Sequence, residues 1–120
     1  MSINRVILEG TVGKVGVLKY DDDGRASVMV SLVTTEHRQR DGQLQEHKDW
    51  HQLSFVGPSA DEVARSLDPG QSLQVDGRLR VRTYTTGEEK RYFVFVEVHA
   101  FDPGRKARPK IDDSARAEAP

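Results

Sequence analysis

The sequence contains no cysteine, few aromatic residues and no marked excess of charge of either sign. Cysteine is absent, aromatic side chains make up 7% of the chain, and 18 Lys and Arg nearly balance 19 Asp and Glu. The lack of cysteine excludes disulfides, thiolate metal sites and cysteine nucleophiles, and it agrees with a reducing compartment. Because the formal net charge is -1, any nucleic-acid site must come from local clustering of cations.

Long apolar runs and targeting signals are also lacking. The chain is 36% hydrophobic and 31% charged, and no apolar stretch is long enough to cross a bilayer. Residues 1–5 contain neither an apolar signal region nor a small-residue cleavage site. We therefore expect a cytoplasmic protein that does not associate with membranes. A length of 120 residues allows one core, so we expect one domain over residues 1–102 and a disordered, charged tail over residues 103–120.

Alternation of apolar and polar residues predicts β-strands along most of the chain. The alternating segments are residues 3–12, 26–33, 50–56, 73–84 and 91–101. A short run at residues 15–20 and the turn residues Asp21-Asp22-Asp23-Gly24 predict a hairpin return. Between the alternating segments 26–33 and 50–56, residues 36–48 are polar around Asp41-Gly42. This predicts a projecting loop and a candidate contact surface.

One short helix is predicted between the third and fourth of these strands. Pro58 stands at its start, Val63 and Leu67 follow at helical spacing, and Asp68-Pro69-Gly70 ends it. Five strands with a helix in this position are the order of the OB-fold, which binds oligomers across an open face and its neighbouring loops. We therefore predict an all-β fold, a five-stranded Greek-key OB-fold barrel with one short helix.

Several short motifs, in this order, resemble those of the bacterial single-stranded DNA-binding protein family. They are the opening strand Asn4–Lys14, Thr34-Thr35-Glu36, Asp49-Trp50-His51, Phe55-Val56-Gly57, and Gly70 followed by Val75–Arg80 and Arg82. The likeness covers residues 3 to about 100, and the order of several motifs is more specific than any one of them. It implies sequence-tolerant binding and protection of single-stranded DNA in replication, recombination or repair.

In that family the bases lie over aromatic rings, and stacking contributes about 1 to 3 kcal/mol per base. The resemblance places Trp50 and Tyr84 at two of the stacking positions, whereas the other two hold Arg38 and Val56. Arg38 can still stack through its guanidinium plane or bind a phosphate, but Val56 cannot replace a ring. Fewer phosphate contacts are expected as well, because three positions that are often basic in the family are neutral here: Gln52, Pro58 and Pro69.

The cations of the predicted fourth strand share the outward parity with Tyr84. Arg78, Arg80 and Arg82 alternate there, and basic grooves with interleaved aromatics are what single strands require. The alternative interpretation is a solvated strand face. Four further cations complete the predicted DNA-binding set: Arg5, Lys14, Lys90 and Arg91.

His51 points inward by parity, and the resemblance places it near a contact between protomers. It is predicted to be an oligomer-interface residue, with a hydrogen-bonded core histidine as the alternative. Because the family enlarges its site by joining OB domains, we expect a homo-oligomer, a tetramer first and a dimer second. No cofactor is expected, and no metal site, since Asp21-Asp22-Asp23 lacks the spaced ligands of a cation loop and His37 and His47 lack a supporting ligand set.

No combination of nucleophile, base and orienting group is present, so no enzyme is predicted. The family commonly ends in an acidic tip closing with Ile-Pro-Phe, which recruits replication and repair partners, whereas this chain ends Ala117-Glu118-Ala119-Pro120. Replication or repair proteins are possible partners, but not by that route. The missing aromatics and cations leave a second hypothesis open, an adaptor similar to primosomal OB proteins whose main role is to bind another replication protein.

Overall fold

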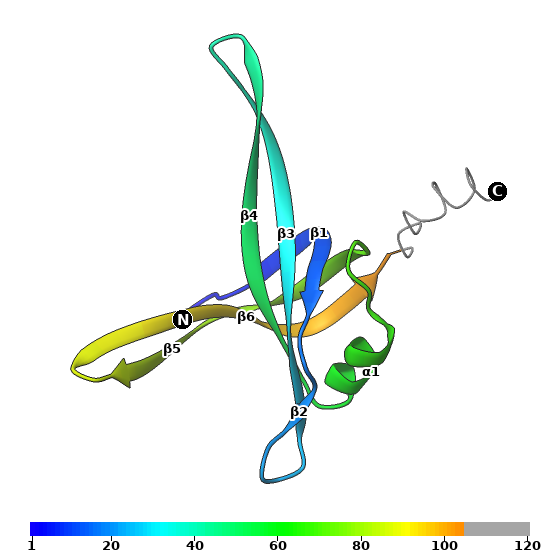
Figure 1. Ribbon diagram of the computed structural model, residues 1–120, viewed down its shortest axis with the longest axis vertical. Helices are drawn as coiled ribbons and strands as arrows, with labels where there is room; N and C mark the ends of the chain where they lie inside the picture. Colours follow the sequence, from blue (N-terminus) through cyan, green and yellow to red (C-terminus); the bar gives the residue numbers. More distant parts are fainter. Residues whose placement is uncertain (105–120) are drawn as a thin grey trace, which may run out of the picture.

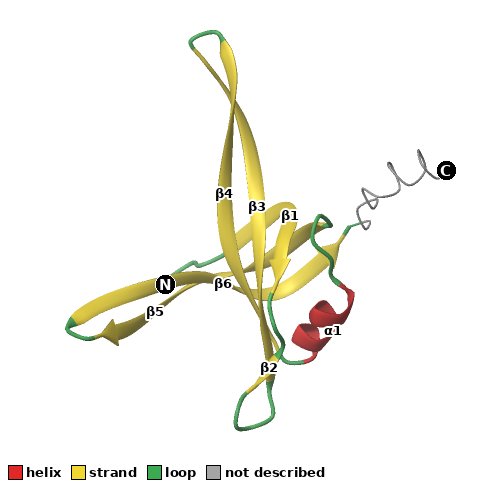
Figure 2. Cartoon of the chain, viewed as in Figure 1, coloured by secondary structure: helices red, strands yellow, loops and turns green. Residues whose placement is uncertain are grey.

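Six strands and one helix make up most of the described chain in the computed structural model, which describes residues 1–104 (Figures 1 and 2). In chain order they are β1 Val6–Val15, β2 Lys19–Tyr20, β3 Ala26–Arg40, β4 Gln43–Val56, α1 Pro58–Ser66, β5 Ser72–Thr86 and β6 Glu89–Pro103. The strands predicted from alternation are all present, and so is the single helix between the third and fourth of them. No helix among the described residues is long and apolar enough to span a membrane.

The sheet closes into a barrel through β1. The strand order is β1-β5-β6-β4-β3-β2, and an additional pairing of β1 with β3 joins the two sides. Thr11 pairs both with Ser72 of β5 and with Val33 of β3, so β1 passes from one partner to the other at this residue. Next to it, a Cβ atom on Gly10 would lie 2.2 Å from the carbonyl oxygen of Val33, so only glycine permits this approach. The predicted five-stranded OB barrel is confirmed.

The barrel interior is filled by one parity of each strand. Its largest fully buried side chains are Phe55, Leu32, Leu53, Leu73, Val12, Val30, Val63 and Val75. Val63 comes from α1, which Pro58 begins and which contacts β3 and β4 at one end of the barrel, where Figure 2 shows it in red. Each such residue removes its side chain from water, and this burial is the main stabilising contribution to the fold.

Two hairpins extend beyond the barrel as arms, one made by β3 and β4 and the other by β5 and β6 (Figure 1). The prediction of a loop at residues 36–48 is wrong. The pairing of β3 with β4 continues to Arg40 opposite Gln43, and only Asp41 and Gly42 form the turn. Both turn residues have positive φ, 52° and 77°, as a two-residue hairpin turn requires. Neither face of this β3–β4 arm covers a core, so both faces can be polar. The sequence of the arm therefore shows no alternation of apolar and polar residues.

The second arm continues the apolar parity of β5 past the core. Leu79 and Val81 are 45% and 57% exposed, although Val75 on the same parity is buried. Beyond Gly77 the strand pairs with β6 alone, and only Gly87 and Glu88 form the turn because Thr86 pairs with Glu89. This arm therefore has two solvent-facing sides.

Strand β6 reaches Pro103, one residue past the predicted domain boundary at 102. The exit of the chain is tied to the start of β5, because Gln71 Nε2 donates to the Gly104 carbonyl at 2.8 Å and the Gly104 amide donates to the Ser72 carbonyl at 2.8 Å. The remainder of the predicted tail, residues 105–120, lies outside the described residues.

We expect Leu53→Ala to lower the free energy of unfolding by about 2 to 5 kcal/mol, because it leaves a cavity where β3, β4 and β6 meet. Leu53 is fully buried and pairs with Val30 and Val96. Leu44→Ala is the control, since Leu44 is 71% exposed on the first arm, and a change within about 0.5 kcal/mol is expected. Urea unfolding followed by circular dichroism measures both, and equal losses would contradict the assignment of the core.

Candidate nucleic-acid interface

One side of the β5–β6 arm combines cations with aromatic rings. In an antiparallel pair, residues opposite each other project from the same side. Arg80 lies opposite Phe95, Arg82 opposite Phe93 and Tyr84 opposite Arg91. The Arg82 guanidinium carbon is 5.3 Å from the centre of the Phe95 ring, and the Phe93 and Phe95 rings stack with centres 5.7 Å apart. On this side of the arm, each ring thus lies opposite an arginine of the neighbouring strand.

Trp50 lies on the outer side of β4 and rests on β1. Its side chain is 59% exposed, and a Cβ atom on Gly13 would lie 2.4 Å from its Cζ3 atom. The absence of a side chain at Gly13 therefore lets the indole lie against the β1 backbone. The ring borders a shallow hollow whose other lining residues are Lys14, Gly16, Met29, Ser31 and Gln52.

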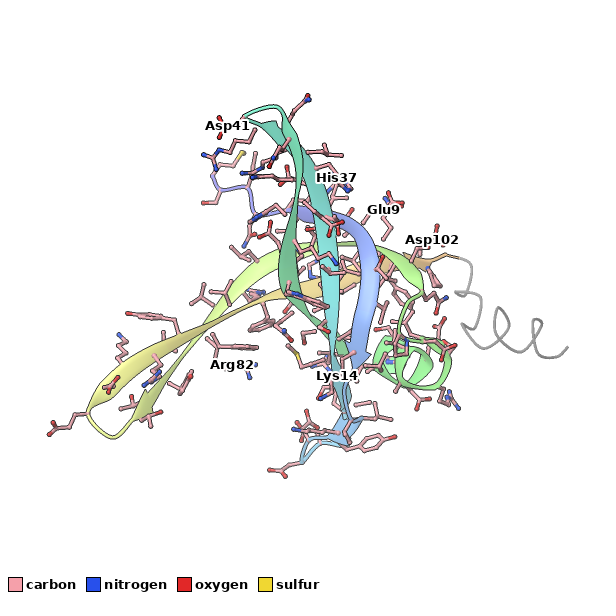
Figure 3. The ribbon with its side chains drawn as sticks, turned by 45° about the horizontal axis from the view of Figure 1, so that its top comes forward. Glu9, Lys14, His37, Asp41, Arg82 and Asp102 are labelled. Carbon is pink, nitrogen blue, oxygen red and sulfur yellow. The ribbon has the colours of Figure 1, made fainter. Side chains whose placement is uncertain are left out.

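A short parallel pairing joins the outer side of β4 to the outer side of the arm. Ser54 of β4 pairs with Glu97 of β6. Trp50 projects on the same side of β4 as Ser54, and Phe95 projects on the same side of β6 as Glu97. Trp50 and Tyr84 therefore belong to one continuous surface that crosses β1, β3, β4, β6 and β5, which we name the open face. Figure 3 labels Lys14 on β1 and Arg82 on the arm, two cations of this face.

Seven of the ten predicted DNA-binding residues come together on the open face. They are Lys14, Trp50, Arg78, Arg80, Arg82, Tyr84 and Arg91. The structure also adds rings that the sequence interpretation missed, Phe93 and Phe95. The signal for them was available, because a two-residue turn at Gly87-Glu88 fixes the register that puts Phe93 opposite Arg82.

Three of the ten predicted residues lie elsewhere. Arg38 pairs with Gln45 on the side of the first arm opposite to Trp50, with its Nη2 atom 3.6 Å from Glu36 Oε1. Lys90 pairs with Thr85 on the other side of the second arm, with Nζ 6.0 Å from the centre of the Tyr92 ring. Arg5 precedes β1 and binds the Asp76 carboxylate through Nε and Nη2 at 3.2 and 2.7 Å. A DNA contact at these residues stays a prediction.

His51 is half-buried at the edge of the core, with its Nε2 atom 2.9 Å from Thr34 Oγ1. This hydrogen bond agrees with the alternative that His51 is a hydrogen-bonded core histidine. A role of His51 at an oligomer interface stays a prediction. Val56 is 39% exposed on the outer side of β4 and offers no ring there. Within residues 1–104, no group of three or more His, Cys, Asp or Glu side chains is arranged to hold a metal ion.

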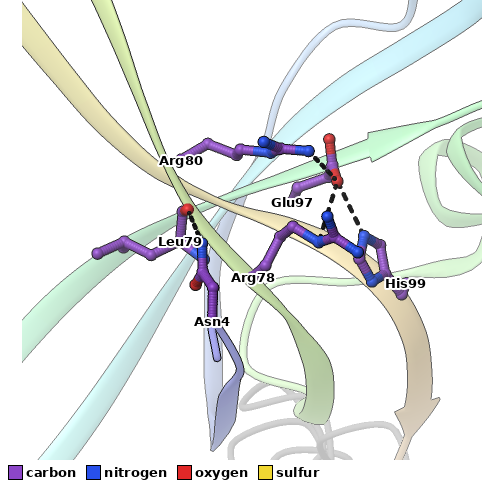
Figure 4. A network of polar contacts seen from close by, with 6 residues as sticks. All are labelled: Asn4, Arg78, Leu79, Arg80, Glu97 and His99. Carbon is purple, nitrogen blue, oxygen red and sulfur yellow. Dashed lines mark hydrogen bonds and ion pairs between the residues drawn. The ribbon is translucent and has the colours of Figure 1, made fainter. Parts of the chain in front are cut away.

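An acidic side chain stands among the arginines of the open face. Glu97 Oε1 lies 2.8 Å from His99 Nε2, 3.4 Å from Arg80 Nη2 and 3.9 Å from Arg78 Nε (Figure 4). The hydrogen bond with His99, and then the one with Arg80, lower the pKa of Glu97 below its ordinary value. The carboxylate is therefore charged at neutral pH and offsets part of the positive charge of the face.

Comparison with known proteins agrees with this geometry. The model of the Single-strand binding protein family matches residues 3–102. The chain belongs to this family. The resemblance noted in the sequence motifs is thereby confirmed.

Curated relatives of this single-strand binding family member come from bacteria. A single-stranded DNA-binding protein of Xanthomonas axonopodis pv. citri (strain 306) is 40% identical over 84 residues, which cover 69% of this chain and 47% of that protein. Single-stranded DNA-binding protein 1 of Xylella fastidiosa (strain 9a5c) is 36% identical over 94 residues, 76% of this chain and 69% of the relative. The chain spans about half the length of several curated relatives it matches.

Solved structures share the fold. A deletion mutant of the single-stranded DNA binding protein from Thermus aquaticus matches with a TM-score of 0.76 and 28% identity, over 86% of this chain and 51% of that chain. The Plasmodium falciparum SSB, solved in complex with ssDNA, matches with a TM-score of 0.76 over 86% of this chain and 94% of that chain. At 23% identity, this second likeness shows the fold alone.

We expect the stability of this SSB-family chain to depend on Asp76 in a pH-dependent way. The hydrogen bond with Arg5 lowers the pKa of Asp76 below its ordinary value of 3.8. The ionised carboxylate therefore stabilises the fold fully above pH 3.8, and this stabilisation is lost as the pH falls through the lowered pKa. Asp76→Asn should therefore lower the urea midpoint at about pH 7 and make little difference at about pH 2. Asp22→Asn, in the β2–β3 turn, is the control, and equal effects of the two variants would contradict the assignment.

Proposed function

We propose that the chain binds single-stranded DNA on the open face, with little sequence preference and without catalysing a reaction. The observation that carries this proposal is that Trp50 and Tyr84, from different strands, project on the same side of the sheet with an arginine row beside Tyr84. A single strand requires rings for its bases and cations for its phosphates along one path. The open face offers both.

The rings make the binding tolerant of sequence, because every base has a π-face. Tyr84 is 48% exposed and Phe93 37% exposed, so both present ring surface to a ligand, and Phe95 lies under Arg82. Phe93 enlarges the platform that Arg38 and Val56 leave incomplete. The surface is therefore less reduced than the two stacking residues predicted from sequence suggest.

The biological role that fits is the protection of transiently exposed single strands during replication, recombination or repair. Family membership and the names of the bacterial relatives support this role. An adaptor function, with DNA binding secondary, is the alternative. The retained rings of the open face favour DNA as the ligand.

A homo-oligomer, a tetramer before a dimer, forms part of the proposal. One OB-fold offers one open face, so several copies are needed to hold a longer strand. The other side of the second arm supports association, because Leu79, Val81 and Val94 are all exposed there and contiguous apolar patches usually mark contact surfaces. His51 is proposed to lie at or near a contact between protomers.

We expect Tyr84→Ala and Trp50→Ala each to weaken binding of a dT oligomer about 5- to 150-fold, the loss of one stacked base. Tyr92→Ala is the matched control, since Tyr92 is 62% exposed on the opposite side of the same arm. Quenching of the single tryptophan reports binding to the native chain and the tyrosine variants, and fluorescence anisotropy of labelled DNA reports all variants.

Equal losses for Tyr84→Ala and Tyr92→Ala, with the oligomeric state unchanged in size-exclusion chromatography, would show that the wrong side of the arm has been assigned. The absence of both quenching and a gel shift at low salt would reject DNA binding altogether. Affinity for DNA only in the millimolar range, together with tight binding of another replication protein, would favour the adaptor.

A further inference from the structure

Glu97 occupies the centre of the open face, where three strands run side by side. Its neighbours across the strands are Ser54 of β4 and Arg78 of β5, and its side chain is 36% exposed. Trp50 lies to one side of it and Tyr84 to the other. A strand of DNA that contacts both rings passes close to this carboxylate.

The backbone of β5 is held so that two arginines face Glu97. Asn4 forms two hydrogen bonds with Leu79. Its Nδ2 donates to the carbonyl oxygen at 2.8 Å (Figure 4), and its Oδ1 accepts from the amide at 2.9 Å. Leu79 separates Arg78 from Arg80 in the strand. Because alternate residues share a side, anchoring Leu79 positions both guanidinium groups on the side of Glu97.

The Glu97 carboxylate has the same recognition chemistry as a DNA phosphate. Both are anionic oxygen acceptors, and arginine binds either through charge-assisted hydrogen bonds. The contacts of Arg78, Arg80 and His99 all fall on a single oxygen, Oε1. Glu97 thus accepts one hydrogen bond from Arg80 and forms an ion pair with Arg78, so it competes for cations that would otherwise face a phosphate.

Arg82 differs from its two neighbours in the row. It shares their parity, but its guanidinium lies over the Phe95 ring at 5.3 Å. Among residues 1–104 no carboxylate lies within ion-pair distance of Arg82, so its hydrogen-bond donors remain available to a phosphate. The row is therefore divided into an engaged part, Arg78 and Arg80, and an available part, Arg82.

We propose that Glu97 is an internal competitor for the DNA phosphate, which occupies Arg78 and Arg80 in the free chain and must be displaced when a strand crosses the open face. This inference rests on the proposed function and concerns the regulation of that same site. Exposed ion pairs are weak, so a phosphate can displace the carboxylate. The result is lower affinity and a flatter salt dependence than the arginines would give by themselves.

The test is a salt titration of dT-oligomer binding to Glu97→Gln. We expect affinity at low salt to rise about 3- to 30-fold, and the slope of log K against log salt to steepen by about 0.7 for each arginine that gains a phosphate. Glu9→Gln is the matched control, because it makes the same change of side chain and charge on β1, opposite Gln74 and away from the arginine row.

A double-mutant cycle with Arg80→Ala shows whether the effect passes through that arginine. Glu97→Gln should strengthen binding less in the Arg80→Ala background than in the native chain. Glu97→Thr is a second variant with the same change of charge, in case the glutamine does not fold. Circular dichroism of each variant checks the fold.

Equal gains from Glu97→Gln and Glu9→Gln would overturn the inference, since long-range charge would then account for the effect. Weaker binding by Glu97→Gln would overturn it too, by showing that Glu97 helps the arginines rather than competing with DNA. In both cases the native chain still binds the oligomer and the proposed function stands. If the native chain and every variant fail to bind, the proposed function itself is rejected.

Discussion

Strand β1 pairs over its first half with β5 and over its second half with β3, and Thr11 takes part in both ladders. This shared strand closes the sheet, and closure gives every strand an inner and an outer side. The approach of Gly10 to the Val33 carbonyl is the steric condition for it. The enclosed core and the separation of inner from outer surface both follow from that closure.

The open face is assembled from elements that are far apart in the chain. Trp50 comes from β4 and Tyr84 from β5, and their common orientation depends on the two paired positions between β4 and β6. The arms lengthen this surface beyond what a small barrel could offer, at the cost of exposing apolar residues such as Val81 on the far side. The surface proposed for DNA and the surface proposed for another protomer thus lie on opposite sides of one hairpin.

Charge on the open face is balanced rather than maximised. The chain has a net charge of -1, and Glu97 neutralises part of the arginine row. In the proposed DNA complex, binding therefore depends more on the rings, whose contribution is insensitive to salt, and less on attraction to the DNA backbone. The proposed competition by Glu97 is one way for a nearly neutral protein to limit how tightly it holds a polyanion.

The amino-acid sequence alone predicts the barrel strands, the helix and the inward parity, because burial in a core imposes a local period of two that can be read without coordinates. The motifs around Trp50 and Arg78 also indicate the family, and with it two residues that are proposed to stack on bases. The sequence could not show that residues 36–48 form a hairpin, because an arm without a core carries no alternation. The opposite sides taken by Arg38 and Trp50, and by Lys90 and Tyr84, depend on register between strands. Only the tertiary structure brought Glu97 to Arg80, since an ion pair across two strands reflects pairing in space and leaves no period in the sequence.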